Sequence, residues 1–198
     1  MAPEGAHRVG ILVFDDVEEL DFVGPWEVFG VAERLIPGSF ALSLVSPRGS
    51  PVRARYGLRI TGTLPMKGAG RMDLLIVPGG VGAKGVMKDA DVLAWIRRAN
   101  EEGAIVASVC TGALILASAG LLDGKRATTH WAALGDLRAF PGVRVEHDRF
   151  IDLGRVVTSA GISAGIDMAL HLVGRFLSPE KAREVAHRME YSASAESP

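Results

Sequence analysis

Short runs of apolar residues, each followed by residues with helical spacing, constrain the fold of this chain most strongly. Three such runs span residues 9–14, 73–77 and 104–109. They have the length of buried strands and are short for buried helices. Buried strands that alternate with helices are typical of a mostly parallel sheet with helices on both faces. The sequence therefore predicts an α/β fold.

The length of the chain bounds the number of domains. With 198 residues, it is long enough for one well-buried α/β domain and short for two. We expect a single domain over residues 8–191, with short flexible tails at 1–7 and 192–198. The charges nearly balance, with 22 basic and 23 acidic residues spread along the chain. This balance predicts no nucleic-acid partner.

One uncharged stretch, residues 104–122, approaches the length of a membrane-spanning helix. Ser108, Thr111 and two glycines divide it, so a buried strand followed by a buried helix explains it better. The first residues lack the pattern of a signal peptide. The single cysteine cannot form an internal disulfide, which fits a reducing compartment. We expect a cytoplasmic protein that does not bind a membrane.

That cysteine, Cys110, is the candidate nucleophile. It lies in Val109-Cys110-Thr111-Gly112, where the third apolar run meets the following helix. A thiol on such a strand-to-helix turn resembles a nucleophile elbow, and the small residue at Gly112 lets the helix pass close to the strand. The N–H groups at a helix start would lower the thiol pKa. The alternative is a buried cysteine that packs as a small hydrophobic residue.

The loop after the first run carries several acidic residues that could serve as proton partners: Asp15, Asp16, Glu18, Glu19 and Asp21. Most acids in such a loop are solvated. Asp21 differs because its neighbours Leu20 and Phe22 favour burial. A carboxyl group in a partly apolar site tends to have a raised pKa and can hold a proton at neutral pH. The alternative for Asp21 is a helix N-cap.

A glycine-rich turn follows the second run. We expect the backbone N–H groups of Gly79 and Gly80 to face charge that develops near Cys110; the alternative is a tight turn without a ligand. Residues 80–85 also match the G-x-G-x-x-G pattern of dinucleotide sites. No helix opens directly after it, and no acidic residue ends a second strand at the required distance. The sequence therefore predicts no nicotinamide or flavin cofactor.

The five histidines show no metal-binding spacing, so we expect no metal site. His130 is the one histidine that we place near the thiol. A Cys110–His130 pair would suit hydrolytic acyl transfer.

Residues 52–60 alternate as a pair of short strands with arginines on the outer face. The arginines of this region are Arg48, Arg53, Arg55 and Arg59. They could form an anion site, but strand alternation alone produces the same pattern on a solvated hairpin. We favour the solvated face.

Several motifs together resemble a known superfamily. They are Leu20-Asp21-Phe-Val-Gly-Pro25, Val77-Pro-Gly-Gly80, Val109-Cys-Thr-Gly112, Thr128-Thr-His-Trp131 and Thr158-Ser-Ala-Gly-Ile-Ser-Ala-Gly165. In this order, over about residues 8–190, they resemble the PfpI/ThiJ superfamily of class I glutamine-amidotransferase-like domains. Leu-Asp-x-x-Gly-Pro with Cys-Thr-Gly is similar to the isonitrile hydratase branch and to the sensor-like domains of AraC-type regulators.

The resemblance implies a flavodoxin-like domain that forms a homodimer, acts on a small molecule and needs no cofactor. It also implies that Cys110 attacks the terminal carbon of an isonitrile, that Asp21 donates and relays the proton, and that Thr111 positions the reacting groups. Water then releases an N-substituted formamide. The Gly79–Gly80 loop and the Thr111 N–H would stabilise charge on the intermediate.

The sequence departs from the family pattern at two places, and these departures disfavour two functional classes. Thr111 stands where the protease-like members have histidine, which argues against a peptidase. No basic helix-turn-helix region follows residue 190, which disfavours DNA binding. Two alternatives to the hydro-lyase remain: a non-catalytic thiol sensor of stress or oxidation, and a glyoxalase-like or hydrolytic enzyme that uses Cys110 with His130.

Overall fold

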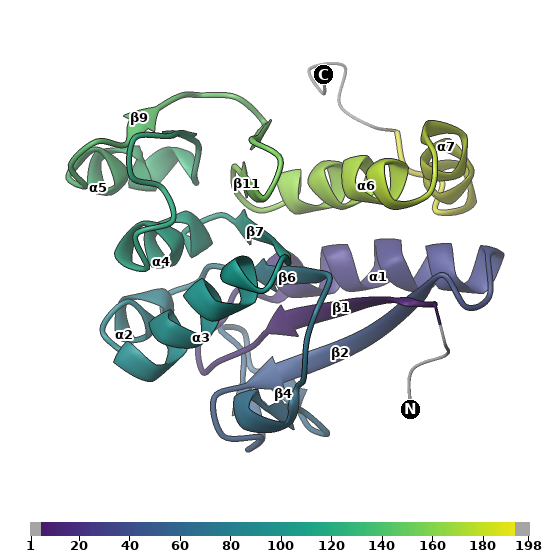
Figure 1. Ribbon diagram of the computed structural model, residues 1–198, viewed down its shortest axis with the longest axis horizontal. Helices are drawn as coiled ribbons and strands as arrows, with labels where there is room; N and C mark the ends of the chain where they lie inside the picture. Colours follow the sequence, from purple (N-terminus) through teal and green to yellow (C-terminus); the bar gives the residue numbers. More distant parts are fainter. Residues whose placement is uncertain (1–4, 193–198) are drawn as a thin grey trace.

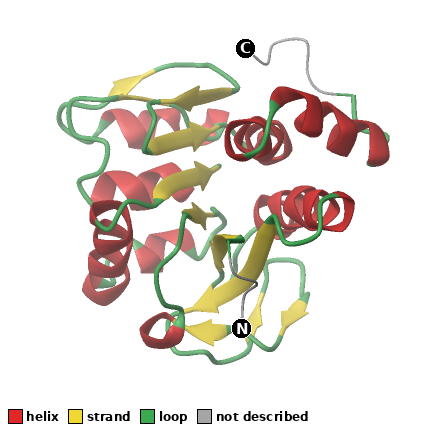
Figure 2. Ribbon diagram, turned by 45° about the vertical axis from the view of Figure 1, so that its right-hand side comes forward, coloured by secondary structure: helices red, strands yellow, loops and turns green. Residues whose placement is uncertain are grey.

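The computed structural model describes residues 5–192 and has three layers, with the sheet between two groups of helices (Figures 1 and 2). The seven strands of the main sheet lie in the order β10 (Phe150–Asp152), β11 (Val156–Ser159), β7 (Ile105–Val109), β6 (Leu74–Val77), β1 (His7–Leu12), β2 (Phe40–Ser46) and β5 (Leu64–Pro65). Every neighbouring pair is parallel except β10 and β11, which are antiparallel. The prediction of a mostly parallel α/β sheet is confirmed.

The helices divide into two groups. Helices α1 (Glu19–Leu35), α6 (Ala164–Phe176) and α7 (Pro179–Arg188) pack on one another. The second group comprises α2 (Ala83–Val86), α3 (Ala90–Glu101), α4 (Gly112–Ser118) and α5 (Leu134–Arg138), the last preceded by the 3₁₀ turn η2 (Trp131–Ala133). Figure 2 shows the strands between these two groups. The arrangement gives the sheet helices on both faces, as the sequence predicts.

Three apolar runs form the centre of the sheet. They become β1, β6 and β7, which are neighbours in the order β7–β6–β1. All four residues of β6 are buried, because helices cover both of its faces. Strand β1 begins at His7, inside the segment expected to be a tail. The outer parts of both expected tails, 1–4 and 193–198, lie outside the described residues.

Two small sheets and one 3₁₀ turn complete the described chain: β3 (Val52–Arg53) with β4 (Arg59–Ile60), β8 (Arg126–Ala127) with β9 (Arg144–Val145), and η1 (Met66–Gly68). Strands β3 and β4 are antiparallel, and Arg53 and Arg59 on them are exposed. The predicted hairpin with outward arginines is therefore confirmed for these two residues.

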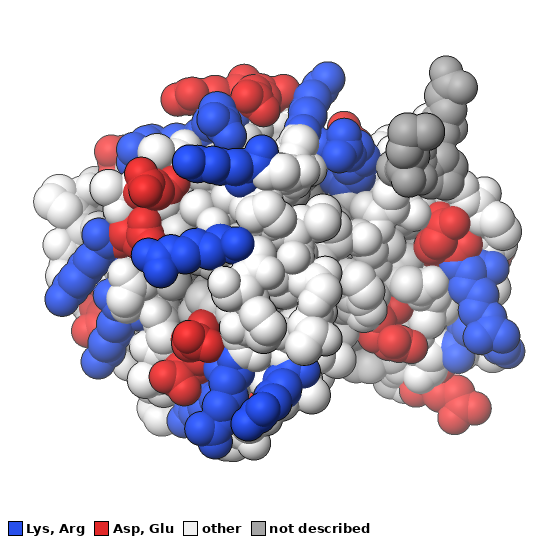
Figure 3. All heavy atoms as spheres, turned by 90° about the horizontal axis from the view of Figure 1, so that it is seen from below, with Lys and Arg blue, Asp and Glu red and all other residues white. Residues whose placement is uncertain are grey.

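The surface carries charges of both signs. On the face drawn in Figure 3, basic and acidic side chains alternate around a central uncharged area. Within residues 5–192 no helix is long and apolar enough to cross a membrane.

Candidate active site

Three connections meet beyond the carboxyl ends of β1, β6 and β7. Ligands of open parallel sheets bind in this crevice. The loop after β1 touches the turn after β6, because the Glu18 N–H donates to the Gly79 carbonyl (3.0 Å). The turn after β6 touches the turn after β7, because the Gly80 N–H donates to Thr111 Oγ1 (3.0 Å). The structure therefore brings together the three loops that the sequence singles out.

Cys110 occupies a strained turn between β7 and α4. Its backbone has φ 56°, in the left-handed region that costs energy for a residue with a side chain. The Cys110 N–H donates to the carbonyls of Ser159 (3.2 Å) and Ala160 (3.1 Å), and the Thr129 hydroxyl donates to the Cys110 carbonyl (2.7 Å). These bonds hold the strained backbone from two sides. The predicted nucleophile elbow is consistent with this geometry.

The thiol of Cys110 is buried, with 7% of the residue exposed. Burial and the neighbouring charge of Asp21 raise its pKa to about 12, and hydrogen bonds from the backbone and side chain of Thr111 offset only part of this rise. The expected lowering of the thiol pKa by the helix start is wrong. Helix α4 has only seven residues, and its effect is smaller than that of burial beside a carboxyl group.

Asp21 lies in the first turn of α1 and is fully buried. Burial raises its pKa to about 7, a hydrogen bond from the Gly79 N–H (2.9 Å) opposes this rise, and the charge of Glu18 adds to it. The expected raised pKa is confirmed. Asp21 does not cap the helix, because α1 begins at Glu19 and Glu18 occupies the cap position.

One oxygen of Asp21 is unsatisfied. The Asp21 carboxyl and the Cys110 thiol are close enough to shift each other's pKa through both charge and hydrogen bonding. Even so, Oδ1 of Asp21 is buried without a hydrogen bond of ordinary geometry to any described residue. Leaving a buried polar atom unpaired costs about 1–3 kcal/mol. Such an atom beside a thiol is suited to carry a proton to a bound reactant.

The Gly79–Gly80 turn has a different role from the one expected. The Gly79 N–H donates to Asp21 Oδ2, and the Gly80 N–H donates to the Thr111 hydroxyl. Both donors therefore have partners and are not free to stabilise charge on a reactant. A side chain at Gly79 would overlap Thr111 and approach Asp21 Oδ2, so this turn must be glycine to hold the acid against the threonine.

His130 is not joined to the thiol. Its Nδ1 accepts from the Ala132 N–H (3.2 Å), and its ring lies 5.4 Å from that of Trp131. Among the described residues, no hydrogen bond or ion pair links His130 to Cys110 or Asp21. The structure thus supports an Asp21–Cys110 pair over a Cys110–His130 pair.

The sequence analysis named Glu18 and Arg55 separately but did not predict the contact between them. Glu18 was expected to be a solvated acid, but only 5% of it is exposed. Its carboxylate pairs with the guanidinium of Arg55 (2.8 Å), which was expected on a solvated face. Because 37 residues separate the two, no local pattern indicates the contact. Within the described part of the chain, no group of three or more His, Cys, Asp or Glu side chains is placed to hold a metal ion.

A model of a known protein family matches most of the chain. The model of the DJ-1/PfpI family matches residues 7–175. The chain belongs to the DJ-1/PfpI family. It is similar to the isonitrile hydratase of Pseudomonas putida, with 37% identity over 94% of this chain and 79% of the relative. It also resembles the crystal structure of a ThiJ/PfpI family protein from Pseudomonas syringae, with a TM-score of 0.87, 30% identity and coverage of 96% of this chain and 77% of the other.

Members of other functional classes are also similar. The HTH-type transcriptional regulator CdhR of Pseudomonas aeruginosa is 31% identical over 85% of this chain. The match covers 50% of that regulator, so the chain spans about half its length. Family membership therefore fixes the fold and leaves the chemistry to be argued from the site.

Proposed function

We propose that the protein is a lyase of the isonitrile hydratase type, which adds water to a small isonitrile and releases an N-substituted formamide. The observation that carries this proposal is the buried Asp21 carboxyl beside the Cys110 thiol, with Oδ1 of Asp21 lacking a hydrogen bond of ordinary geometry. The similarity to the Pseudomonas putida isonitrile hydratase supports it. The reaction needs a nucleophile and a proton donor on one carbon atom, and these two groups supply both.

The first half of the reaction uses the single proton that the two groups hold above about pH 7. The Cys110 thiol passes its proton to the Asp21 carboxylate. The sulfur then bonds to the terminal carbon of the isonitrile, while Asp21 gives that carbon the proton. One carbon–sulfur and one carbon–hydrogen bond form, and the product is a thioimidate on Cys110. The Asp21–Cys110 pair therefore carries one negative charge throughout this half, first on the carboxylate, then on the sulfur, and finally on the carboxylate again.

The second half uses water. Water adds to the thioimidate carbon, one of its protons goes to the substrate nitrogen, and a carbon–oxygen bond forms. Breaking the carbon–sulfur bond then releases the formamide, and the hydroxyl proton returns to sulfur through Asp21. The backbone and side chain of Thr111, which hydrogen-bond Cys110, keep the sulfur in place through both halves.

We further propose that the protein works in the cytoplasm as a homodimer on a small molecule, without a nucleic-acid partner. The three most exposed large apolar side chains of the described chain are Trp131 (78%), Tyr56 (73%) and Val81 (57%). In the sequence, they directly follow His130, Arg55 and Gly80, respectively. Exposed large apolar side chains are candidates for contact with a second subunit. Light scattering that shows a monomer at micromolar concentration would contradict the dimer.

The alternative functions receive less support. A peroxide sensor needs an accessible thiolate, whereas burial raises the thiol pKa of Cys110. A glyoxalase-like or hydrolytic enzyme would use His130 with the thiol, but no hydrogen bond joins His130 to Cys110 among the described residues.

The test is turnover of cyclohexyl isocyanide, followed as formamide appearance by NMR. We expect the wild-type protein to form the formamide, and Cys110→Ala and Asp21→Asn to lose this activity. Ser118→Ala, on the same helix as the elbow, is the matched control and should keep it. Absence of turnover by the wild-type protein, or full turnover by Cys110→Ala, would overturn the proposal.

A further inference from the structure

An ion pair lies next to the Asp21–Cys110 pair and takes no part in the reaction proposed above. Glu18 is three residues before Asp21 and is buried, while its partner Arg55 keeps 44% of its side chain exposed. The charge of Glu18 acts on Asp21, and the charge of Arg55 interacts with Cys110. Each half of the ion pair thus acts on one half of the reacting pair.

The hairpin that carries Arg55 is joined to the acidic loop by several hydrogen bonds. The Arg55 N–H donates to the Val17 carbonyl (3.0 Å), and the Tyr56 N–H donates to Glu19 Oε1 (2.7 Å). Two further bonds are Asp16 N–H to the Arg53 carbonyl (2.8 Å) and Arg53 N–H to Asp15 Oδ1 (2.9 Å). Because these bonds fix both backbones, the 2.8 Å contact between Arg55 and Glu18 joins two held segments and is not a chance surface pair.

The acidic loop is in turn fixed to the site. Val17 forms a bridge with Gly80, and the Glu18 N–H donates to the Gly79 carbonyl. Gly79 holds Asp21 through its N–H. A continuous set of bonded backbone segments therefore runs from the hairpin to the reacting carboxyl.

We propose that Glu18 and Arg55 are positioning residues that set the pH at which the Asp21–Cys110 pair becomes reactive, Glu18 by holding a proton on Asp21 and Arg55 by limiting that effect. This inference rests on the proposed function for its meaning in catalysis. The geometry on which it depends does not: Glu18 is ion-paired with Arg55, and its backbone is bonded to Gly79, which in turn holds Asp21.

The two residues have effects of opposite sign. A negative charge near Asp21 favours its protonated form, and a positive charge that pairs with Glu18 weakens that influence. The other charged groups that face this region are Asp15, Asp16, Glu19 and Arg53. Two of them, Asp15 and Glu19, accept backbone N–H groups of the hairpin. These four groups are present in every variant proposed below, so they do not account for a difference between the pH profiles of two variants.

The experiment is the pH dependence of Cys110 alkylation by iodoacetamide, measured by intact mass, since this readout needs no isonitrile turnover. We expect the wild-type rate to rise through a step near pH 7, because the pair holds two protons below this pH and one above it. Glu18→Gln should move the step to lower pH and Arg55→Met to higher pH, each by about half a unit or more. The double variant should lie between the two.

Two further variants separate charge from structure. Arg59→Met removes a cation from the same hairpin and should leave the step unchanged. Arg55→Lys keeps the positive charge and should show the wild-type step. If Arg55→Met fails to fold, Glu18→Gln and Arg55→Lys still test the effect of charge. Shifts of the same sign in Glu18→Gln and Arg55→Met, or no shift in either folded variant, would overturn the inference.

The same variants, assayed for kcat/KM with cyclohexyl isocyanide, connect the step to catalysis. The acid limb of kcat/KM should move with the alkylation step. If the wild-type protein hydrates no isonitrile but the alkylation steps still shift in opposite directions, the proposed function fails and the inference about the ion pair stands.

Discussion

Two aspartates of this protein are almost equally buried, yet their surroundings are opposite. Asp167, 3% exposed in the first turn of α6, receives the Arg149 Nε (2.6 Å) and the Tyr191 hydroxyl (3.1 Å) on one oxygen. Asp21, fully buried in the first turn of α1, receives one backbone N–H, lies beside the Cys110 thiol and meets no cation among the described residues. A buried carboxylate that meets a guanidinium serves the fold, whereas one that lacks a cation is available for chemistry.

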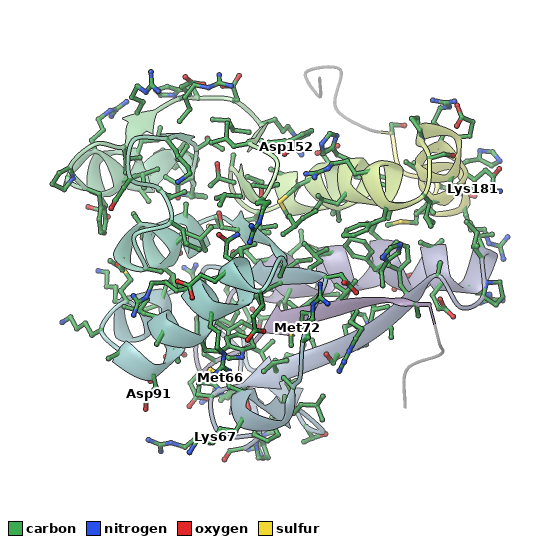
Figure 4. All side chains as sticks on the ribbon, in the orientation of Figure 1. Met66, Lys67, Met72, Asp91, Asp152 and Lys181 are labelled. Carbon is green, nitrogen blue, oxygen red and sulfur yellow. The ribbon has the colours of Figure 1, made fainter. Side chains whose placement is uncertain are left out.

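A third acid follows the pattern of Asp167. Asp152 ends β10, near α6 in Figure 4, and binds His171 Nε2 (2.7 Å) and Arg175 Nη1 (2.9 Å). Burial raises the pKa of Asp152, but hydrogen bonds from His171 and Gly154 and the charge of Arg175 outweigh this, so its pKa is lowered. The acids near β10 thus have cationic partners, whereas Asp21 forms no ion pair with any described residue.

The largest effect should come from neutralising the unpaired acid. Asp21→Asn keeps the shape of the side chain and removes the proton that the isonitrile carbon needs. We expect kcat/KM for isonitrile hydration to fall about 10²–10⁴-fold. Asp167→Asn, assayed at a temperature where it remains folded, should stay within about 3-fold of the wild type, because it lies outside the site. Equal losses in the two variants would remove the contrast between these acids.

The pH dependence of stability should sharpen the same contrast. The folded pKa of Asp21, about 7, lies above its ordinary value of 3.8, so the folded state binds more protons between these values. The wild-type protein therefore loses stability relative to Asp21→Asn as the pH rises through this range, by about 4 kcal/mol in total. Urea unfolding of both proteins at about pH 4 and about pH 8 measures the change. A constant gap between them would contradict the raised pKa.

Removing the charge from Asp167 should destabilise the protein. Asp167→Asn leaves the Arg149 guanidinium without its anion, and breaking a buried pair costs about 3–5 kcal/mol. Because 21% of the Arg149 side chain is exposed and can be rehydrated, we expect about 3 kcal/mol. The free energy of unfolding in urea is the measurement, and a loss below about 1 kcal/mol would show that the pair contributes little.

The smallest effect concerns one hydroxyl. Tyr191→Phe removes the hydrogen bond from Tyr191 to Asp167 and leaves the ring in place. We expect a loss of about 1 kcal/mol in the free energy of unfolding and no change in kcat/KM. A change in kcat/KM without a change in the free energy of unfolding would show that Tyr191 acts on the reaction and not on the stability of the fold.

Local sequence patterns were sufficient for the frame of the site. The apolar runs gave β1, β6 and β7, and small residues after Cys110 indicated the elbow. Asp21 was selected among the loop acids because Leu20 and Phe22 were expected to be buried; Phe22 is buried, but Leu20 is 39% exposed. These features depend on residues close in the chain, where strand length, turn chemistry and burial preference act directly.

Contacts between distant segments could not be predicted in this way. The partners of Asp167 lie 18 and 24 residues away, and Arg55 lies 37 residues from Glu18. The use of the Gly79 and Gly80 N–H groups depends on how the turn meets α1 and α4. The thiol pKa depends on whether burial raises it more than the N–H groups at the helix start lower it. The sequence indicates that both effects are present but does not give their sizes.

The left-handed backbone at Cys110 places stability and chemistry in opposition at one position. Glycine tolerates this conformation without the steric cost that a side chain incurs. Cys110→Gly would remove this steric cost, but it would also remove the packing of an almost fully buried side chain, and the reaction with it. The strain at this turn is therefore a cost that the fold bears for a single sulfur atom.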